Sequence, residues 1–562
     1  MRKWIVKEPS EQRKIGTEHK IPEPILNILF DRGYNSSTKI NKFLNPSLTD
    51  LNDPFLFRDM EKAVDRILAA VSNKERILIF GDYDVDGVTG TALLIKALSE
   101  LDGKLNHYIP HRIKEGYGFS TGGVEYARKI GASLIITVDC GITAQETIGI
   151  AKAGGADVII CDHHAADSAP DAYAVLNPKV DDHYPFTELA GCGVAFKLVH
   201  ALYIKLKRPE DEIYKYLDIV SLGTIADVSP LVDENRIITR YGLERLSRTD
   251  NLGLRNLIEA TGITDRKFTS YHAGYILGPR INAAGRIAEA DKGLRLILTD
   301  DPNEARSLAL HLNQINQDRK DIENEILEDA LIRAEREGIK GRVVVLANEN
   351  WHEGVIGIVA SRISEKFFRP TFLISITADQ SRGSARGIKG FDVFGALKAA
   401  APTLIEYGGH KEAGGFSLQT ERIGEFRSAL EEFALNFPEE IFQPSLFIDF
   451  QLELGIIDED FLRHLLRFEP TGVGNPRPSF LTRDVLTVGY PKIVGSDHLR
   501  FAVMKNNHHQ QAIYYQQGSL IEKLEVGKST LDIVYTVDQD QIAVRPKPIL
   551  KIRDMRIRGV DS

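Results

Sequence analysis

Three carboxylates directly after a short apolar segment are the feature that most constrains this chain. Residues 76–80 form an almost continuous apolar run, which is typical of a strand buried on both faces of a sheet. The run leads into Gly81-Asp-Tyr-Asp-Val-Asp-Gly87, where Asp82, Asp84 and Asp86 would point to one face if the backbone stayed extended. Three carboxylates this close repel one another unless cations lie among them. The motif therefore predicts a site for hard divalent cations such as Mg²⁺ or Mn²⁺.

The same residues also match the start of a calcium-binding loop of the EF-hand type, whose pattern is D-x-D-x-D-G. That loop needs a bidentate acid at its twelfth position, where this chain has Leu93. An EF-hand loop also follows a helix, whereas residues 76–80 are predicted to be a strand. These two differences favour Mg²⁺ or Mn²⁺ over a calcium loop.

Two further acidic motifs follow two further predicted strands. Residues 133–138 lead into Asp139, and residues 156–160 lead into Cys161-Asp-His-His164. A helix predicted from Thr89 to Leu101 follows the first strand, and this strand–helix alternation indicates an α/β fold with a parallel sheet. Ligands of such sheets bind beyond the carboxyl ends of the strands. We therefore expect the three motifs to meet in one site.

Asp139 and the adjacent histidines each leave a structural alternative open. Asp139 stands before a segment that resembles the start of a helix, so its side chain would serve equally as a helix cap. Adjacent histidines on an extended chain point to opposite sides, so at most one of His163 and His164 is expected to bind a given metal. A second pair, His508-His509, lies in a predicted turn between two β-like runs. A histidine pair alone is therefore weak evidence of a site.

Asp227 follows a predicted helix at residues 214–225 and precedes Val-Ser-Pro230. The dipole of a helix disfavours a carboxylate at its C-terminal end. A purely structural role is therefore less natural for Asp227 than metal ligation.

The pattern along the 562 residues predicts several domains, because a typical domain has about 150 residues. One long charged helix, running from Asp301-Pro302 to Gly338 and about 55 Å long at 1.5 Å per residue, is expected to connect two of them. The last part of the chain has short apolar runs bounded by Gly, Asp and Asn, which is an all-β pattern. The predicted parts are an N-terminal cap (1–50), a parallel-sheet domain (51–300), a connecting helix (301–340), a smaller α/β domain (341–438) and an all-β domain (445–562).

The amino-acid composition indicates the cellular environment of the protein more clearly than its chemical function. No apolar run approaches the ~20 residues of a transmembrane helix, so no membrane association is expected. Cys140, Cys161 and Cys192 form no C-x-x-C pair, which favours free thiols in a reducing, cytoplasmic environment. The net charge of −9 argues against nucleic-acid binding, but it averages over domains and includes the clustered acids of a metal site.

Six segments in order resemble the motifs of the DHH phosphoesterase family and its second, DHHA1-like domain: Gly81–Gly87, Val138–Gly141, Asp162–His164, Gly223–Val228, Gly383–Arg386 and Tyr407–Phe416. A seventh segment, Gly278-Pro-Arg-Ile-Asn-Ala-Ala-Gly-Arg286, and the terminal β domain narrow this resemblance. They are similar to the branch of bacterial single-stranded-DNA-specific 5′→3′ exonucleases.

The resemblance implies two Mn²⁺ or Mg²⁺ ions. Asp84 would bind one ion and Asp86 the other. Asp139 would bridge them, and His163 and Asp227 would complete the second site. Two such ions stabilise the attacking and leaving oxygens of an in-line displacement at phosphorus.

It also implies roles around the ions and at the 5′ end of the substrate. Asp82 would bind a metal or position its water, Asp162 would orient a histidine, and His164 would face the scissile phosphate. Arginine forms bidentate contacts with phosphate, and glycines let backbone N–H groups approach it closely. The candidate substrate-binding residues are Arg280, Arg286, Ser384, Arg386, Gly408, Gly409, His410, Gly414 and Gly415. A structural ion pair for Arg286 and plain turn chemistry for the glycines remain alternatives.

The terminal domain resembles an OB-fold, which binds single strands with a basic groove and stacking aromatic side chains. Tyr514 and Tyr515 are candidates for stacking, with ordinary barrel positions as the alternative. The local positive excess consists of Arg545, Lys547, Lys551, Arg553, Arg556 and Arg558.

The expected function is therefore hydrolysis of single-stranded DNA from its 5′ end to 5′-mononucleotides, in DNA recombination and repair. The resemblance suggests a monomer, with single-strand-binding protein and a RecQ-type helicase as partners. One alternative is a DHH phosphoesterase for short oligonucleotides or cyclic dinucleotides, which is usually much shorter and lacks the β domain. Another is an inactive relative that serves as a replication scaffold, but such a protein is expected to have lost metal ligands that this chain keeps.

Overall fold

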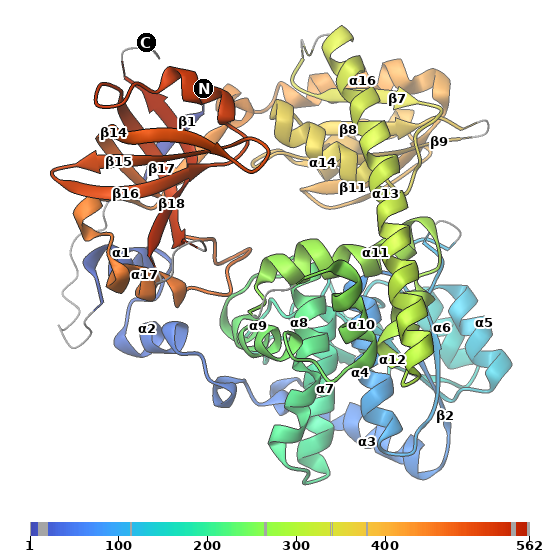
Figure 1. Ribbon diagram of the computed structural model, residues 1–562. Coiled ribbons are helices and arrows are strands. Elements are labelled where there is room, and N and C mark those ends of the chain that lie inside the picture. Colours follow the sequence, from blue (N-terminus) through green and yellow to red (C-terminus); the bar gives the residue numbers. More distant parts are fainter. Residues whose placement is uncertain are drawn as a thin grey trace. The chain divides into compact units, whose positions relative to one another are not determined.

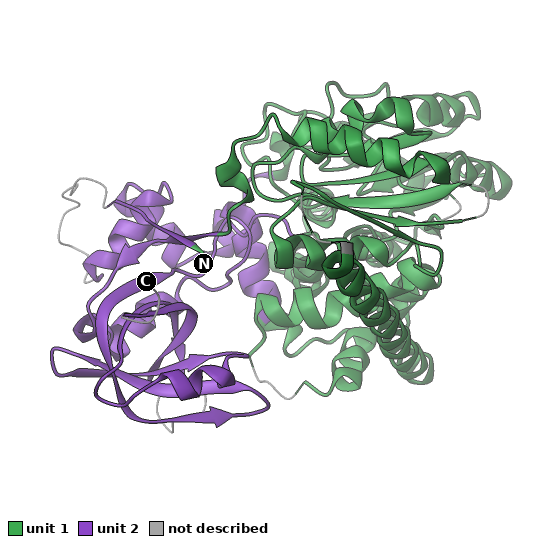
Figure 2. Ribbon diagram, turned by 90° about the horizontal axis from the view of Figure 1, so that it is seen from above, with its two compact units in different colours: residues 1–2, 54–227, 244–444 green, residues 3–53, 228–243, 445–562 purple. Residues whose placement is uncertain are grey.

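The computed structural model describes residues 2–8, 21–112, 115–263, 267–337, 339, 341–377, 380–540 and 547–558. Arg545 lies outside these residues. The chain divides into two compact units, which Figure 2 colours separately. Unit 1 comprises residues 1–2, 54–227 and 244–444, and unit 2 comprises residues 3–53, 228–243 and 445–562.

Unit 1 contains the predicted parallel sheet. Its five strands lie in the order β3-β2-β4-β5-β6, and all of their pairings are parallel. The three central strands are almost entirely buried, which explains their continuous apolar runs. The strands are β2 (Arg76–Gly81), β3 (Lys104–Tyr108), β4 (Leu134–Val138), β5 (Asp157–Cys161) and β6 (Ala174–Leu176).

Helices enclose this sheet (Figure 1). Helices α5 (Thr121–Ile130) and α6 (Gln145–Ala153) pack their apolar residues against one set of strand side chains. Helices α4 (Val85–Ser99), α7 (Gly191–Lys205) and α8 (Leu217–Ala226) contact one another and are buried around most of their circumference. The prediction that a helix follows β2 is confirmed, but α4 begins at Val85 rather than Thr89.

The remaining helices of this part of unit 1 are α3 (Met60–Ser72), α10 (Leu252–Thr261), α11 (Gly278–Ile287) and α12 (Asp291–Leu298). A π-helix, η4 (His272–Leu277), precedes α11. The predicted connecting helix is α13 (Pro302–Glu337), with 36 residues. It contacts α10, α11 and α12, and its last turns share an apolar cluster with the next domain.

That next domain is the smaller α/β domain. Its sheet has the order β10-β11-β9-β8-β7, in which only the β7–β8 pair is parallel. The strands are β7 (Val344–Asn348), β8 (Thr371–Ser375), β9 (Ser381–Arg386), β10 (Glu406–Gly409) and β11 (Ala413–Leu418). The helices are α14 (Ile356–Phe367), α15 (Val393–Ala399) and α16 (Ile423–Ala434).

Unit 2 contains a closed five-stranded barrel, as the OB-fold prediction requires. The order is β14-β15-β16-β18-β17, and an additional β14–β17 pairing closes the ring. The strands are β14 (Phe480–Val494), β15 (His498–Lys505), β16 (His508–Tyr514), β17 (Thr530–Gln539) and β18 (Pro548–Ile557).

The N-terminal segment belongs to the same unit as the barrel. Strand β1 (Lys3–Val6) pairs in parallel with β12 (Ser445–Ile448). Helices α1 (Glu23–Asp31), α2 (Ser37–Leu44) and α17 (Glu459–Leu466) contribute buried side chains to the apolar core that also fills the barrel.

Several details of unit 2 refine the sequence-based expectations. Asn506 and Asn507, both at positive φ, form the turn of the β15–β16 hairpin, and exposed His508-His509 begin β16. Tyr514 packs against the barrel core, whereas Tyr515 is exposed. Part of the basic excess is neutralised, because Lys551 pairs with Asp538 and Arg558 with Asp484 and Asp532.

The three cysteines are buried free thiols. No helix in the described part of the chain is long and apolar enough to cross a membrane.

Arg236 on α9 (Asp233–Leu246) joins the separate segments of unit 2. Its buried guanidinium lies 4.1 Å from the centroid of the Phe43 ring, and burial lowers its pKa to about 10. It donates hydrogen bonds to the backbone oxygens of Phe43, Arg467, Phe468, Glu469 and Pro470.

We expect Arg236→Met to destabilise unit 2 by on the order of 3 kcal/mol, because several buried carbonyls lose a charged donor. Chemical denaturation followed by circular dichroism measures this change. Arg240→Met is the matched control, because Arg240 is exposed and donates one hydrogen bond, to the Glu469 carbonyl. Equal losses in the two variants would contradict the prediction.

Candidate metal centre and phosphate site

The five predicted ligands and Asp82 lie together at the carboxyl ends of the strands of unit 1. Ligand atoms of Asp82, Asp84 and Asp139 lie within 4.8 Å of one another, and so do those of Asp86, His163 and Asp227. Asp139 also connects the two groups, because its Oδ1 lies 3.1 Å from Nε2 of His163. Motifs that follow β2, β4, β5 and α8 therefore form one cluster.

Two helix N-termini hold the acids of the first motif. Asp84 caps α4, and its Oδ1 accepts hydrogen bonds from the N–H groups of Asp86 (2.9 Å) and Gly87 (3.2 Å). Asp86, in the first turn of α4, accepts from the N–H groups of Gly191 (2.6 Å) and Cys192 (2.9 Å) at the start of α7. The segment therefore does not stay extended after β2, because capping and the helix dipoles favour an immediate helix.

Asp139 does not cap a helix. The next helix, α6, has Ala144 at its N-cap and no side-chain cap. Asp139 instead has a left-handed backbone with φ of 61°, while its N–H donates to the Cys161 carbonyl over 2.8 Å. Backbone conformations of this kind cost energy for residues other than glycine and concentrate at functional sites.

Asp162 orients both histidines without lying in the ligand cluster. Its Oδ1 accepts from the N–H groups of His163 (2.7 Å) and His164 (3.1 Å) and from Nδ1 of His164 (2.8 Å). Its Oδ2 accepts from the N–H of Ile142. Burial raises the pKa of Asp162, but these hydrogen bonds lower it by more, so Asp162 is held as an anion.

The two histidines do not point to opposite sides as expected, because their ring centroids lie 4.5 Å apart and Nδ1 of His164 is also within 3.8 Å of Asp139 Oδ1. Nε2 of His163 lies 3.8 Å from Asp86 Oδ2 and 4.0 Å from Asp227 Oδ1, and its side chain is buried. The side chain of His164 is 41% exposed. Burial lowers the pKa of His164, but its hydrogen bond to Asp162 and the nearby carboxylates raise it overall.

Asp227 is the C-cap of α8, where its carboxylate is unfavourable for the helix dipole. Gly223, one turn earlier, lets α8 approach the first motif closely. A Cβ atom on Gly223 would lie 2.2 Å from Thr89 Oγ1 and 2.6 Å from Cys192 Sγ. The close approach of α8 is what positions Asp227 beside Asp86 and His163.

The electrostatics of the cluster fit bound cations. Burial, together with neighbouring carboxylates, raises the pKa of Asp82 and Asp139 well above the usual range and that of Asp86 to about 6. Asp82 Oδ1, Asp139 Oδ1 and His163 Nε2 are buried atoms that have no hydrogen-bond partner. Carboxylate oxygens with an imidazole nitrogen suit Mn²⁺ or Mg²⁺, so the donor set fits two such ions.

A group of arginines lies in the same unit. Arg286 is partly buried and donates to the Gly354 carbonyl, and desolvation with the nearby charges of Arg112 and Arg386 lowers its pKa to about 9. Arg386 donates to Ser384 Oγ over 3.0 Å. Within the described ranges, no carboxylate pairs with Arg112, Arg286 or Arg386, so the structural ion pair considered for Arg286 is not found. Uncompensated cations in this arrangement suit a phosphate.

Arg280 does not join this group. Its Nε donates to Asn313 Oδ1 on α13 and its Nη1 to the Ile276 carbonyl in η4. Burial alone lowers its pKa, without a contribution from Arg386 or any other charge. The structure therefore brings Ser384, Arg386 and Arg286 together and leaves Arg280 beside the π-helix.

The four glycines of the β10–β11 hairpin form two pairs that differ in the space around them. Gly409 and Gly414 are required by the fold, because a Cβ on Gly409, at φ of 137°, would lie 2.4 Å from the Ala413 carbonyl oxygen. Gly408 and Gly415, paired across β10 and β11, have no atom within 4 Å of an added Cβ. Gly415 also pairs with Ser384, so the open pair lies beside the arginine group. His410 is exposed in the turn between the two strands.

Two residues near the cluster were missed by sequence reasoning. Arg112 follows β3, whose mixed composition (KLNHY) does not indicate a strand. No ligand-binding residue was therefore expected at the end of this segment. Tyr117 lies between Gly116 and Gly118, both at positive φ. Its hydroxyl donates to the Asp139 carbonyl over 3.2 Å and lies 2.9 Å from Nδ1 of His164. The Gly116-Tyr117-Gly118 sequence was the feature that could have indicated a special role for Tyr117.

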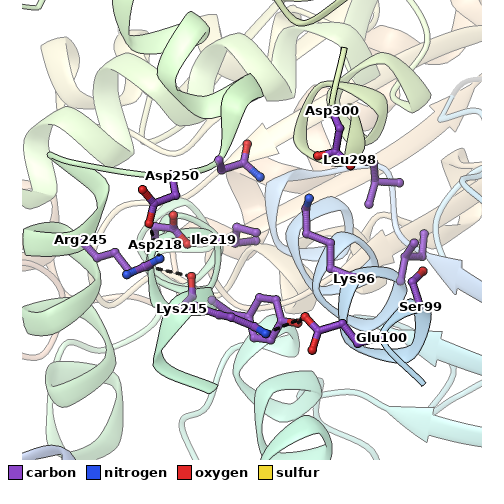
Figure 3. Close-up of a pocket in the computed structure, with 13 residues that line it drawn as sticks. Lys96, Ser99, Glu100, Lys215, Asp218, Ile219, Arg245, Asp250, Leu298 and Asp300 are labelled. Atoms are coloured by element: carbon purple, nitrogen blue, oxygen red, sulfur yellow. Dashed lines mark hydrogen bonds and ion pairs between the residues drawn. The ribbon is translucent and has the colours of Figure 1, made fainter. Parts of the chain in front are cut away.

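Two other groups of charged residues in unit 1 have binding partners within the protein. A pocket of about 440 Å³ has charged walls, but Lys215 pairs with Glu100 and Arg245 with Asp250 (Figure 3). Asp181, Asp182 and His183 have the spacing of a metal site, but Arg58 binds both carboxylates. Neither feature requires a ligand.

A parallel sheet whose strand ends carry these acids, joined to a second α/β domain with a glycine-rich hairpin, defines a phosphoesterase of the DHH class. The model of the DHH family, N-terminal domain, matches residues 76–224. The DHHA1 domain matches residues 340–436, and the RecJ OB domain matches residues 448–554.

The similarity extends over nearly the whole chain. The single-stranded-DNA-specific exonuclease RecJ of Bacillus subtilis is 36% identical over 563 residues, which cover 99% of this chain and 71% of that protein. RecJ of Thermus thermophilus is 37% identical over 77% of this chain and 63% of its own length. The chain belongs to the RecJ family.

Solved structures agree with this assignment. The structure of RecJ in complex with Mn²⁺ from Thermus thermophilus superimposes with a TM-score of 0.84 at 30% identity, covering 99% of this chain and 79% of that one. The complex of the same protein with Mg²⁺ gives a TM-score of 0.79. Both ions predicted from the acids are therefore bound by a relative.

The raised pKa of Asp86 predicts a pH-dependent stability of the metal-free protein. Its value is about 6 in the folded chain, against about 3.9 in an unfolded one. At a pH between these two pKa values, the folded state binds more protons than the unfolded state. Protonation of Asp86 therefore contributes stability that is fully present below the unfolded pKa and is lost as the pH rises through the folded pKa.

Asp86→Asn removes the titrating group and with it this loss of stability at higher pH. In the presence of a chelator, we therefore expect the Tm of the variant to exceed that of the unaltered protein by an amount that grows from about pH 4 to about pH 7. Differential scanning fluorimetry measures the Tm values. Mn²⁺ should raise the Tm of the unaltered protein more than that of the variant. Asp182→Asn, which removes an exposed carboxylate, is the control. A Tm difference independent of pH would argue against the prediction.

Proposed function

We propose that this chain hydrolyses single-stranded DNA from its 5′ end and releases 5′-mononucleotides, using two Mn²⁺ or Mg²⁺ ions. The observation that carries the proposal is the pairing of two ligand groups, joined through Asp139, with an uncompensated arginine group in the same unit. Relatives over most of the chain are named single-stranded-DNA-specific exonucleases.

In this proposal Asp82, Asp84 and Asp139 would hold one ion, and Asp86, His163 and Asp227 would hold the other, with Asp139 available to both. When bound, two such ions lower the pKa of water and stabilise charge on a phosphate undergoing in-line displacement. The N–H groups at the starts of α4 and α7 keep Asp84 and Asp86 in place throughout.

His164 is the residue best placed to contact the scissile phosphate. Its ring is partly exposed, is held by Asp162 and has a raised pKa, so it is readily protonated. A protonated imidazole donates a charge-assisted hydrogen bond to a phosphate oxygen. The Tyr117 hydroxyl lies 2.9 Å from Nδ1 of the same ring and also donates to the Asp139 carbonyl, so it helps to position His164.

Recognition of a terminal phosphate at the 5′ end would set the polarity of the reaction. A phosphomonoester carries about −1.5 to −2 charges at pH 7, whereas each internal diester carries about one. Arg112, Arg286 and Arg386, with Ser384 and open backbone at Gly408 and Gly415, favour the group with the greater charge. Arg280 and His410 are proposed to contact the strand further along.

The competing functions explain fewer features. A cyclic dinucleotide has no terminal phosphate, and short oligonucleotides do not need the closed barrel of unit 2. An inactive scaffold does not need the buried, unpaired ligand atoms of the acidic cluster. The proposed setting is DNA recombination and repair in the cytoplasm, as a monomer, with single-strand-binding protein and a RecQ-type helicase supplying the single strand.

We expect Asp139→Asn to lower nuclease activity on the order of a thousandfold, because several kcal/mol of stabilisation by the ions depend on this ligand. The assay follows a 5′-labelled single strand with Mn²⁺, on which the unaltered protein should release labelled mononucleotide first. Asp182→Asn should retain activity. Long labelled products, or equal rates on a matched duplex, would contradict the proposal.

Arg386→Met should weaken recognition of the 5′ end. Because a charged hydrogen bond contributes about 1.5–3 kcal/mol, we expect the preference for 5′-phosphorylated over 5′-hydroxyl strands to fall at least about tenfold. The ratio of kcat/KM for the two strands measures this preference. Arg382→Met is the control on the same strand, because Arg382 is about half exposed and pairs with Glu353. An unchanged ratio in Arg386→Met would refute the assignment.

A further inference from the structure

Two tyrosines on the π-helix side of unit 1 are stacked on each other and open to solvent. Tyr271 is 60% exposed and Tyr275 is 75% exposed. Their ring centroids lie 5.4 Å apart with an angle of 21° between the planes. Each ring therefore covers one face of the other and leaves its outer face accessible. Exposed aromatic surface of this kind marks interaction sites.

The fold directs these rings outward by packing small residues inward. Gly274 and Gly278 face α8, where an added Cβ would lie 3.3 Å from Ile225 Cγ2 and 3.2 Å from Ala226 Cβ, respectively. Ile225 and Ala226 directly precede Asp227. The π-helix is thus seated on the turn of α8 that directly precedes the metal ligand Asp227.

Both ends of the π-helix are fixed. At its start, Nδ1 of His272 accepts from the N–H of Thr269, and the His272 ring stacks on Phe268 at 5.0 Å and 15°. At its end, Arg280 donates to the Ile276 carbonyl over 2.6 Å. Arg280 also places a positive charge one turn beyond Tyr275. π-helical segments are rare and frequently occur at functional sites.

We propose that Tyr271 and Tyr275 form a stacking platform for the bases of the single strand that the metal centre cleaves, an inference that rests on the proposed function. Aromatic rings bind any base through its π-face, so the platform would be independent of sequence. Bases in a duplex already stack on their neighbours and pair within the helix, so the platform would engage only unpaired strands. It would therefore contribute to strand selectivity as well as affinity.

The test is a steady-state comparison of the full-length Mn²⁺-loaded protein with two double variants on a 5′-phosphorylated oligothymidylate. We expect Tyr271→Ala with Tyr275→Ala to raise KM at least about tenfold with little change in kcat, as is usual when stacking on a base is lost. Tyr271→Phe with Tyr275→Phe should keep KM within about twofold of the unaltered protein, because phenylalanine stacks equally well.

A matched strand of abasic residues separates stacking from structural damage, because it offers phosphates without bases. The alanine variant should equal the unaltered protein on this strand. Ile332→Ala, which removes an exposed apolar side chain from α13, should change neither substrate's KM. An unchanged KM in the alanine variant, or an equal rise on the abasic strand, overturns the platform. If the unaltered protein degrades no single strand, the proposed function fails as well.

Discussion

The repulsion among buried carboxylates at the ends of β2 and β4 is the constraint on which the rest of the structure depends. Burial raises the pKa of Asp82, Asp86 and Asp139, so these side chains resist ionisation. The folded backbone nevertheless holds them close together. The backbone N–H groups at the starts of α4 and α7 bind two of the acids directly. Helix positions, glycine contacts and the left-handed backbone of Asp139 all follow from assembling anions where water is excluded.

The arginine group is the electrostatic counterpart of this cluster within unit 1. Burial and the nearby charge of Arg112 lower the pKa of both Arg286 and Arg386, just as burial and neighbouring carboxylates raise the pKa of the acids. The two groups do not neutralise each other through ion pairs in the described residues. A ligand that carries several phosphates and is accompanied by divalent cations satisfies both groups at once, which is why a polynucleotide suits this chain better than a neutral substrate.

Local sequence patterns predicted the parallel sheet, the long helix, an all-β terminal domain and the cluster of acids, because each depends on apolar periodicity or on the ends of buried strands. The closed barrel was expected only from the resemblance to an OB-fold. The extended backbone on which a shared face for Asp82, Asp84 and Asp86 depended is not formed, since the capping preference of Asp84 competes with strand extension. Arg112 was missed because β3 is an edge strand with a mixed composition. Separating Arg280 from Ser384 and Arg386 required tertiary information, because its partners Asn313 and Ile276 lie on other elements. The π-helix also required it, since its outward tyrosines depend on packing against α8.

The pairing of β1 with β12 has a consequence for biosynthesis. Lys3 is aligned with Ser445, so β1 leaves the ribosome long before its partner strand, which is encoded more than 400 residues later. Unit 2 is likewise assembled from three stretches of chain, whereas the acidic cluster of unit 1 is complete once Asp227 has been synthesised. Translation therefore delivers the metal-binding half of the molecule while the opening segment is still a free edge strand, which is the period when this protein most needs protection from association with other nascent chains.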